Sequence, residues 1–347
     1  MKAAVLHSVG DLRYEEVEDP HISEGEVLIK VKACGVCGSD VPRVMEKGTY
    51  YFPLIPGHEV SGQIISTEGR PGDIKKGDRV TVFPLIPCGK CAYCKIGRYN
   101  LCDNYNYLGS RCNGGFAEYV RAPVDNLIKV PENVSYEEAA LTEPASVALH
   151  ALRRAKVDTA DKLAILGTGP IGILLAQWAR IMGAGDIFLI DIEEKKLEFA
   201  GEKYGFTKLI NSRNDDPVDV IKRETKGRGV DIAIEAAGVP VTLRQAIELA
   251  RKGGRVVFLG NMRGDVTLPE RIISSILRKE LILYGSWNSN FTSLPKNEWE
   301  TSLRFMQIGK LKVEPLITHR FKLEKVREVF EMMYKKSEFF NKVLLIP

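Results

Sequence analysis

Four cysteines have a spacing that suits a bound metal ion. Cys88, Cys91, Cys94 and Cys102 form the pattern CxxCxxCx7C, in a chain of 347 residues that has only seven cysteines. CxxC steps let neighbouring thiolates converge on one tetrahedral ion, and four sulfurs complete the coordination shell of Zn²⁺. A complete shell leaves no position for a substrate, so the quartet predicts a structural zinc site.

Other uses of such a quartet stay open at this point. Disulfides belong to oxidising compartments, and no hydrophobic signal segment follows Met1, so we expect a cytoplasmic protein with reduced cysteines. An iron–sulfur cluster also takes four thiolates, but the bacterial ferredoxin pattern is tighter and ends in a proline, where this chain has Asp103. A zinc ribbon that binds nucleic acid is the competing function.

A glycine motif suits a dinucleotide. Residues 167–172 read GTGPIG, and they stand between an apolar run at 162–166 and a stretch with apolar residues at helical spacing. Glycines at the first two positions allow a tight turn and close backbone approach, and amides at the start of the helix can hold a pyrophosphate. The candidate cofactor residues are Gly167, Gly169, Pro170, Ile171 and Gly172.

An acidic residue follows the glycine motif at the sequence separation typical of a residue that binds the ribose of a dinucleotide. Asp191 follows Gly172 by nineteen residues and ends the next predicted strand. Its carboxylate can accept hydrogen bonds from ribose hydroxyls and would repel a 2′-phosphate, which favours NAD over NADP. Lys196 is a second candidate for the ribose, with a solvated helix lysine as the alternative.

Composition excludes several classes of function. The net charge is +4, and basic residues occur in pairs among acidic ones, so no nucleic-acid surface is indicated. No apolar run reaches the ~18 to 20 residues that span a bilayer. With 44% apolar residues the chain can bury a core, and its length suggests roughly two domains.

The elements that would position these residues follow two patterns. Up to about residue 145 the chain has short β runs broken by Gly, Pro and Asp, at 26–32, 62–65 and 78–82, which favour an antiparallel or barrel-like domain. Residues 84–109 form a Cys-rich lobe with little periodicity. Later, six apolar runs alternate with helices, as in a doubly wound parallel sheet; these runs are 162–166, 186–190, 208–210, 230–234, 255–259 and 281–284. Helices at 299–308 and 323–334 precede a last strand, 342–346, that we expect to return to the first domain.

Two further segments, CGSD at 37–40 and GHE at 57–59, contain metal-ligand residue types but are ambiguous alone. They are followed along the chain by the four-cysteine lobe, by GGFAEY at 114–119 and by GTGPIG. With these five motifs in this order, the chain resembles the medium-chain zinc-dependent alcohol and polyol dehydrogenases over nearly its whole length. The resemblance implies an α/β fold: a GroES-like β-barrel catalytic domain (1–148), a Rossmann NAD-binding domain with a doubly wound parallel sheet (149–287), and a return to the catalytic domain (288–347).

The resemblance also implies a second, catalytic zinc. Its ligands would be Cys37, His58 and Glu143, with Glu59 as an alternate ligand, and Ser39 would relay the substrate proton. Asp40 would orient His58. This implies two Zn²⁺ per subunit, one catalytic and one structural, and NAD. A zinc-free reductase of the same family would lack the catalytic ligands.

Within the family, CGSDVPR at 37–43 and GSR at 109–111, ahead of GGFAEY, resemble the enzymes of polyol phosphates, which implies oxidation of a secondary hydroxyl of a substrate such as galactitol 1-phosphate. Arg43 is the first candidate for the phosphate and Arg111 a weaker one, and Trp287 would line the pocket. The alternative is an unphosphorylated polyol of the sorbitol type, or a secondary alcohol. We expect a homo-oligomer, a dimer rather than a tetramer, that pairs through residues 281–286, with no nucleic acid or membrane as partner.

Overall fold

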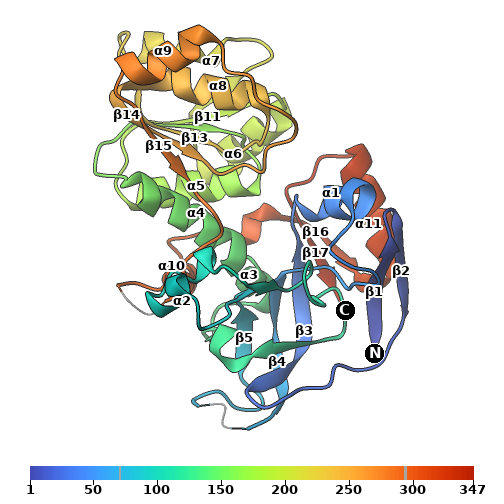
Figure 1. The fold of residues 1–347 in the computed structure, drawn as a ribbon. Coiled ribbons are helices and arrows are strands. Elements are labelled where there is room, and N and C mark those ends of the chain that lie inside the picture. Colours follow the sequence, from blue (N-terminus) through green and yellow to red (C-terminus); the bar gives the residue numbers. More distant parts are fainter. Residues whose placement is uncertain (70–71, 293–294) are drawn as a thin grey trace. The chain divides into compact units, whose positions relative to one another are not determined.

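The computed structural model describes residues 1–69, 72–292 and 295–347. These residues form two compact units (Figure 1). Unit 1 contains Met1–Ser146 and Ser289–Pro347, and unit 2 contains Val147–Asn288. Unit 1 is therefore built from two separate stretches of the sequence.

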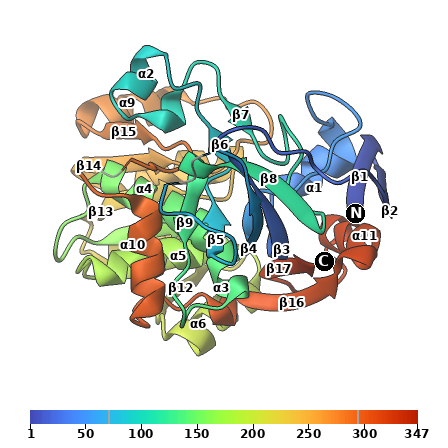
Figure 2. The same cartoon turned by 90° about the horizontal axis from the view of Figure 1, so that it is seen from below.

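One seven-stranded sheet forms the centre of unit 1. Its order is β16-β17-β3-β4-β5-β9, with β8 also paired to β3; Figure 2 shows β3, β4 and β5 side by side. All neighbours are antiparallel except β16 and β17, which are parallel. The strands are β3 (Glu26–Val36), β4 (Glu59–Thr67), β5 (Arg79–Val82), β8 (Tyr119–Pro123), β9 (Leu127–Lys129), β16 (Ile317–Lys322) and β17 (Lys342–Ile346).

The last strand returns to the first strands, as the sequence predicted. In β17, Val343 lies opposite Val36 and Leu345 opposite Cys34 of β3. The first four residues of β17 are buried, because the strand lies between β16 and β3. In β3, by contrast, buried Val27, Ile29 and Val31 alternate with more exposed residues, the period of two expected of a strand with one face on the core.

Helix α11 (Val326–Lys335) covers the core of unit 1. Its buried residues Val326, Val329, Phe330 and Met333 recur at spacings of three and four, which places them on one helical face. Phe330 meets Phe116 edge-on, with ring centroids 6.0 Å apart. Both belong to the core cluster that also contains apolar residues of β1, β3, β4 and β17.

Unit 1 contains further helices and strands around this sheet and helix. Residues 84–109 contain only brief elements, as expected of the predicted lobe. The set is β1 (Lys2–Ser8), β2 (Asp11–Glu16), α1 (Asp40–Pro42), η1 (Arg43–Lys47), β6 (Leu85–Ile86), α2 (Ala92–Lys95), η2 (Tyr99–Leu101), β7 (Asn106–Tyr107), η3 (Val124–Asn126), α3 (Tyr136–Ala140), α10 (Glu298–Gln307), η4 (Glu314–Leu316) and η5 (Leu323–Lys325). Helix α4 (Thr142–Ala155) contains the boundary between the units.

Unit 2 has one parallel sheet of the order β12-β11-β10-β13-β14-β15. Numbered within the unit this is 3-2-1-4-5-6, the order of dinucleotide-binding sheets, and it confirms the six predicted strands. The strands are β10 (Leu163–Leu166), β11 (Ile187–Asp191), β12 (Lys208–Asn211), β13 (Val230–Glu235), β14 (Ala250–Phe258) and β15 (Ile282–Gly285). The helices are α5 (Pro170–Ile181), α6 (Glu194–Tyr204), α7 (Pro217–Glu224), α8 (Pro240–Leu249) and α9 (Glu270–Arg278).

Strand β14 begins five residues earlier than the sequence predicted. Its pairing with β13 is irregular, because Val230 faces Ala250 whereas Ile232 faces Arg255. The intervening residues carry charge and two glycines, so no apolar pattern marks them as a strand.

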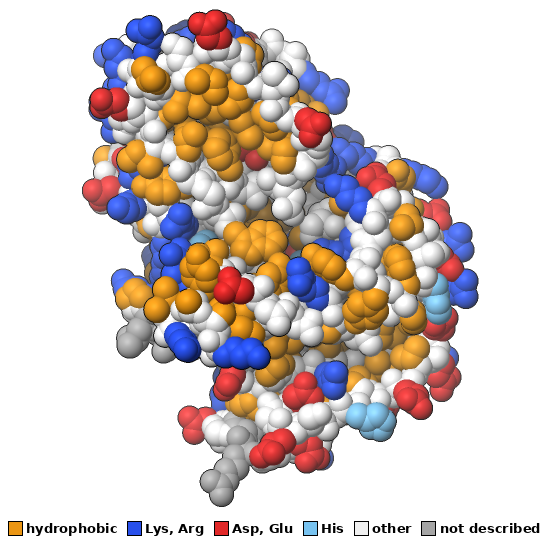
Figure 3. All heavy atoms as spheres, viewed as in Figure 1, with side chains coloured by type: hydrophobic (Ala, Val, Ile, Leu, Met, Phe, Trp, Pro, Cys, Tyr) orange, Lys and Arg blue, Asp and Glu red, His pale blue; other side chains and the backbone are white. Residues whose placement is uncertain are grey.

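The outer edge of this sheet is partly apolar. Strand β15 is the last in the sheet, and its Ile282 and Leu283 are exposed, as are Ile273 and Leu277 of α9. Figure 3 shows hydrophobic side chains gathered over unit 2. In the described ranges, no helix combines the length and apolar character that a bilayer-spanning segment requires.

Candidate active site and metal centres

The four cysteines of the lobe converge in space. Their sulfurs all lie within 4.8 Å of one another, and the Cys88–Cys94 and Cys91–Cys102 pairs are each 4.0 Å apart. Local turns bring them together: Cys91 caps α2 by accepting a hydrogen bond from the amide of Cys94 at 3.4 Å, and the amide of Cys88 donates to the sulfur of Cys102 at 3.2 Å.

These distances fit a zinc ion and not a disulfide. A disulfide holds its sulfurs about 2.05 Å apart, whereas Zn–S bonds of about 2.3 Å put the sulfurs of a tetrahedral site about 3.8 Å apart. All seven cysteines are free thiols. Backbone amides of Lys90 and Cys91 lower the pKa of Cys88 to about 6, while burial raises the pKa of Cys94 to about 12. A bound cation would offset the unfavourable burial of neighbouring thiolates.

A second cluster consists of Cys37, His58 and Glu59, whose ligand atoms lie within 4.8 Å of one another. The sheet explains the convergence. Cys37 directly follows β3 and His58 directly precedes β4, and the two strands are antiparallel with Gly35 opposite Glu59. A hairpin-like pairing of this kind brings the end of one strand beside the start of the next, so CGSD and GHE meet.

Asp40 links the two halves of this cluster. Its Oδ2 accepts a hydrogen bond from the amide of Cys37 at 3.1 Å, and its Oδ1 lies 3.4 Å from Nδ1 of His58, at an ion-pair distance without hydrogen-bond geometry. Burial would raise the pKa of Asp40, but the charges of His58 and Arg43 hold that pKa below its usual value. Because Nδ1 faces the carboxylate, Nε2 of His58 is the nitrogen left for a metal.

Ser39 lies beside the cluster. Its hydroxyl donates to the sulfur of Cys37 at 3.2 Å, and its backbone amide approaches the same sulfur at 3.5 Å. Such donors stabilise a thiolate.

Two carboxylates compete for the position next to Cys37 and His58. Glu59 belongs to the group of close ligand atoms, whereas Glu143, the second residue of α4, is buried outside that group. Burial raises the pKa of Glu143 to about 7, with the charge of His58 acting to lower it and that of Glu59 to raise it. Glu143 is therefore near enough to sense both residues electrostatically.

Lys342 is a site residue that the sequence reasoning missed. Its Nζ donates to both carboxylate oxygens of Glu59, at 2.6 and 2.8 Å, and to the backbone carbonyl of Val36 at 3.4 Å. The Lys342 and Glu59 side chains are only 4% and 1% exposed. The carboxylate of Glu59 thus already has a cationic partner. The sequence offered one indication of a buried, paired lysine: Lys342 stands at the start of an otherwise apolar strand.

Tyr107 is a second missed residue. Its ring lies edge-on to the His58 ring, with centroids 5.7 Å apart. Burial and the nearby charges of Glu143 and Cys37 raise its pKa well above the usual value. Tyr107 belongs to β7, five residues after Cys102, so the cysteine lobe leads directly to the second cluster.

The predicted substrate residues have other partners. Arg43 forms an ion pair with Asp40 and is partly buried. Arg111 lies over the rings of Tyr50 and Tyr105, at 4.3 and 4.4 Å, and donates to the Tyr50 hydroxyl at 3.1 Å. Trp287, in unit 2, is 47% exposed.

The glycine motif forms the turn between β10 and α5. Gly167 has a φ of +104°, in the region that favours glycine. A Cβ at Gly172 would lie 1.9 Å from the carbonyl oxygen of Gly167, so helix and turn pack too closely for any side chain. A Cβ at Gly169 would meet nothing within 4 Å. This free space in front of the backbone fits the pyrophosphate of a dinucleotide, with Pro170 and Ile171 opening the helix.

Asp191 ends β11 and reaches this turn. Its Oδ2 accepts the amide of Thr168 at 2.8 Å, and its Oδ1 accepts the amide of Glu193 at 3.0 Å. Lys196 pairs with Glu193 at 3.3 Å. Asp191 therefore ties the second strand to the glycine turn, a structural role that the sequence did not reveal.

Glu235, at the end of β13, was also missed. It is fully buried, and its Oε1 accepts the amides of Ala237 and Gly238 at 2.9 and 2.7 Å and the hydroxyl of Thr242 at 2.8 Å. Leu166 of β10 lies opposite Glu235 of β13. The turn that follows β13 therefore lies next to the glycine turn, at the same edge of the sheet.

Comparisons with known proteins agree with this geometry. Residues 23–132 match the alcohol dehydrogenase GroES-like domain and residues 170–307 match the zinc-binding dehydrogenase domain. The chain is 36% identical to sorbitol dehydrogenase of Bacillus subtilis (strain 168), over 100% of this chain and 97% of that protein. It is 35% identical to galactitol 1-phosphate 5-dehydrogenase of Escherichia coli (strain K12), over 100% of both. The crystal structure of galactitol-1-phosphate dehydrogenase from Escherichia coli superimposes with a TM-score of 0.94 and 36% identity, over 100% of both chains. The predicted combination of a GroES-like barrel and a Rossmann fold is confirmed.

The ion pair of Glu59 and Lys342 generates a first prediction. Lys342→Met leaves a buried carboxylate without its cation, and breaking a buried pair in this way costs about 3–5 kcal/mol. We expect a melting temperature several degrees below that of the native chain in a thermal scan. The control Lys335→Met removes an exposed lysine, whose partner Glu331 is also partly exposed, and should change little. Adding Glu59→Gln to Lys342→Met should recover much of the loss, and a Lys342→Met protein as stable as the control would contradict the argument.

Proposed function

Because this chain belongs to the family of zinc-dependent alcohol and polyol dehydrogenases, we propose that it oxidises a secondary hydroxyl of a polyol phosphate with NAD. Zinc and NAD are the cofactors of the family. The observation that carries the proposal is the convergence of Cys37, His58 and the buried carboxylate of Glu59 at the junction of β3 and β4. On this proposal, unit 1 would bind the metals and the substrate and unit 2 would bind NAD. The sequence-based expectation was a catalytic domain at 1–148 with a return at 288–347, and an NAD-binding domain at 149–287.

We propose Cys37, His58 and Glu143 as the ligands of the catalytic zinc. Glu59 is the alternative, but its two oxygens already accept hydrogen bonds from Lys342, which makes it the weaker ligand. Asp40 holds the imidazole with Nε2 free. A zinc bound at this site acts as a Lewis acid that lowers the pKa of a substrate hydroxyl. The second zinc would be held by the four cysteines of the lobe.

The proton of that hydroxyl needs an acceptor, and Ser39 is our candidate. Its hydroxyl lies beside the sulfur of Cys37, so it is next to the position that a substrate oxygen would occupy. NAD would accept the hydride; the glycine turn would bind its pyrophosphate and Asp191 would bind its adenosine ribose. Lys196, which pairs with Glu193, is a less direct candidate for the ribose.

The substrate we propose is galactitol 1-phosphate, oxidised to tagatose 6-phosphate. The likeness to galactitol 1-phosphate 5-dehydrogenase extends over the full length of both chains. Arg43 could hold the phosphate with the part of its guanidinium that Asp40 does not occupy, with Arg111 as a second cation.

Two observations favour a second candidate, an unphosphorylated polyol such as sorbitol. The ion pair with Asp40 gives Arg43 a structural role without phosphate, and the identity to a sorbitol dehydrogenase is the same within one per cent. The two candidates differ in one measurable property, the response to a phosphate group on the substrate.

We further propose a cytoplasmic homodimer. Free thiols suit a reducing compartment. The exposed Ile282 and Leu283 on edge strand β15 would be covered if two copies paired there.

Zinc content separates the two metal centres. Cys37→Ala should reduce zinc from two ions per chain to one and abolish turnover, while circular dichroism stays unchanged. Cys91→Ala should instead reduce folded yield, because zinc binding to a structural site is folding free energy. Cys112→Ala, a thiol outside both clusters, is the control and should keep both ions. A fully active Cys37→Ala enzyme would end the catalytic assignment.

Cofactor choice tests Asp191. Asp191→Asn removes the charge that would repel a 2′-phosphate but keeps an oxygen that can accept the amide of Thr168. We expect the ratio of kcat/KM for NAD to kcat/KM for NADP to fall by about tenfold or more, as befits the loss of one charged contact. Asp191→Ala should also lower stability, since the turn loses its acceptor. An unchanged cofactor ratio in both variants would refute the role.

A panel of sugar alcohols and their phosphates, assayed with NAD and added zinc, tests the substrate. Galactitol 1-phosphate should give the highest kcat/KM. In Arg43→Ala, KM for the phosphorylated substrate should rise by about tenfold or more, and Arg43→Lys should recover part of it. KM for the unphosphorylated polyol should change much less. Equal effects on both substrates would make Arg43 a purely structural partner of Asp40.

A further inference from the structure

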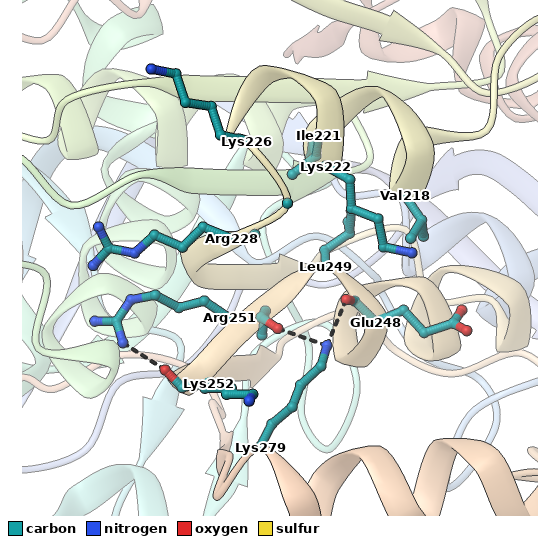
Figure 4. A pocket seen from close by; sticks show the side chains of 13 residues that line it. Val218, Ile221, Lys222, Lys226, Arg228, Glu248, Leu249, Arg251, Lys252 and Lys279 are labelled. Atoms are coloured by element: carbon teal, nitrogen blue, oxygen red, sulfur yellow. Dashed lines mark hydrogen bonds between the residues drawn. The ribbon is translucent and has the colours of Figure 1, made fainter.

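Unit 2 contains a cationic pocket away from the glycine turn. The pocket has a volume of about 570 Å³, and it is lined by α7, the turn after it, the end of α8, the start of β14 and Lys279, which directly follows α9 (Figure 4). Its basic lining residues are Lys222, Lys226, Arg228, Arg251, Lys252 and Lys279, and Glu248 is the one acidic residue in the lining.

The fold explains why basic residues collect here. The register shift between β13 and β14 lets residues 251–254 depart from regular pairing, so Arg251 and Lys252 enter the lining. The turn that follows α7 brings Lys226 and Arg228 to the same place. Figure 4 shows the side chains of Arg228 and Arg251 extending to the same side of the pocket.

Three of the charged lining residues already form ion pairs or hydrogen bonds within the protein. Glu248 forms an ion pair with Arg271, and Arg251 forms one with Asp231. Lys279 donates to the backbone carbonyls of Glu248 and Ala250, at 2.9 and 2.8 Å, and so caps the end of α8 (Figure 4).

The other four cations have no carboxylate partner. Among the residues that the structure describes, no acidic group lies within ion-pair distance of Lys222, Lys226, Arg228 or Lys252. Burial lowers the pKa of Lys279, and the charge of Lys222 lowers it further, whereas the charge of Glu248 raises it, so Lys279 senses both a neighbouring cation and the acidic residue of the lining. A bound anion would relieve this repulsion.

We propose that this pocket binds a small polyanion with two or more phosphate groups. Its volume lies within the range of small-molecule sites, ~300–1,000 Å³. Four unpaired cations match the roughly four negative charges of a triphosphate chain, and the guanidinium of Arg228 can hold two oxygens of one phosphate at once.

The pocket is separate from the cofactor site. The glycine turn follows the carboxyl end of β10, whereas the pocket lies at the amino ends of β13 and β14. All three strands are parallel, so the two sites are at opposite edges of one sheet, separated by about the length of a strand, ~13–20 Å. NAD and the polyanion could therefore be bound together.

Calorimetric titration with inorganic tripolyphosphate tests the proposal. The zinc-loaded full-length protein is titrated with NADH present at saturation, so that the probe cannot enter the cofactor site. We expect binding that the double variant Arg228→Ala with Lys252→Ala weakens by about tenfold or more. The matched control, Lys203→Ala with Arg327→Ala, makes the same change in net charge on exposed residues outside the pocket and should bind as the native chain does.

Three results would overturn the proposal: no binding by the native chain in the presence of NADH, equal weakening in the control, or equal affinity of the double variant. A DNA duplex that bound through Arg228 and Lys252 where tripolyphosphate did not would also overturn it. Because neither residue contacts the proposed catalytic site, turnover by the double variant should match the native rate and confirm that it is folded.

Discussion

The buried ion pair of Glu59 and Lys342 is the interaction on which the candidate catalytic site depends. It joins a strand near the end of the chain to the strand that presents His58, and it lies beside the junction with β3 that presents Cys37. A Cβ at Gly35 would lie 1.9 Å from Glu59, so the sheet leaves room for this carboxylate only because that residue is glycine. Burying two charges costs solvation free energy, and their attraction offsets this cost only when the geometry is good. Here both carboxylate oxygens of Glu59 accept hydrogen bonds from Lys342. The pair therefore neutralises the charge of Glu59 inside the sheet and links β17 to the start of β4.

The two cysteine-containing clusters differ in whether a bound zinc would keep an open coordination position. The quartet of the lobe offers four sulfurs at tetrahedral spacing and no open position. The other cluster offers one sulfur, one imidazole and a choice of carboxylates, so a bound zinc would keep a position for substrate. Tyr107 connects them, because its strand continues from the lobe and its ring packs on His58. A loss of zinc from the lobe would on this account disturb the catalytic site through that packing, without any shared ligand.

Much of this could be read from the sequence, because several signals are local. The cysteine spacing, the glycine turn with its following helix and the six apolar runs each depend on residues close together in the chain, and the structure reproduces them. The rest depends on register and tertiary contact. Lys342 meets Glu59 across 283 positions, Arg43 turns to Asp40, and the start of β14 is hidden by its irregular pairing. Such partners are set by which strands become neighbours, which no local pattern encodes.

The central claim is an open zinc site at Cys37 and His58, distinct from the zinc of the cysteine lobe. X-ray diffraction from crystals of the full chain, recorded above and below the zinc absorption edge, tests it most directly. We predict two anomalous peaks per chain, one among the four lobe sulfurs and one within about 2.3 Å of the sulfur of Cys37 and about 2.1 Å of Nε2 of His58, with Glu143 as the third ligand. A single peak in the lobe, from protein that is fully active, would contradict the account.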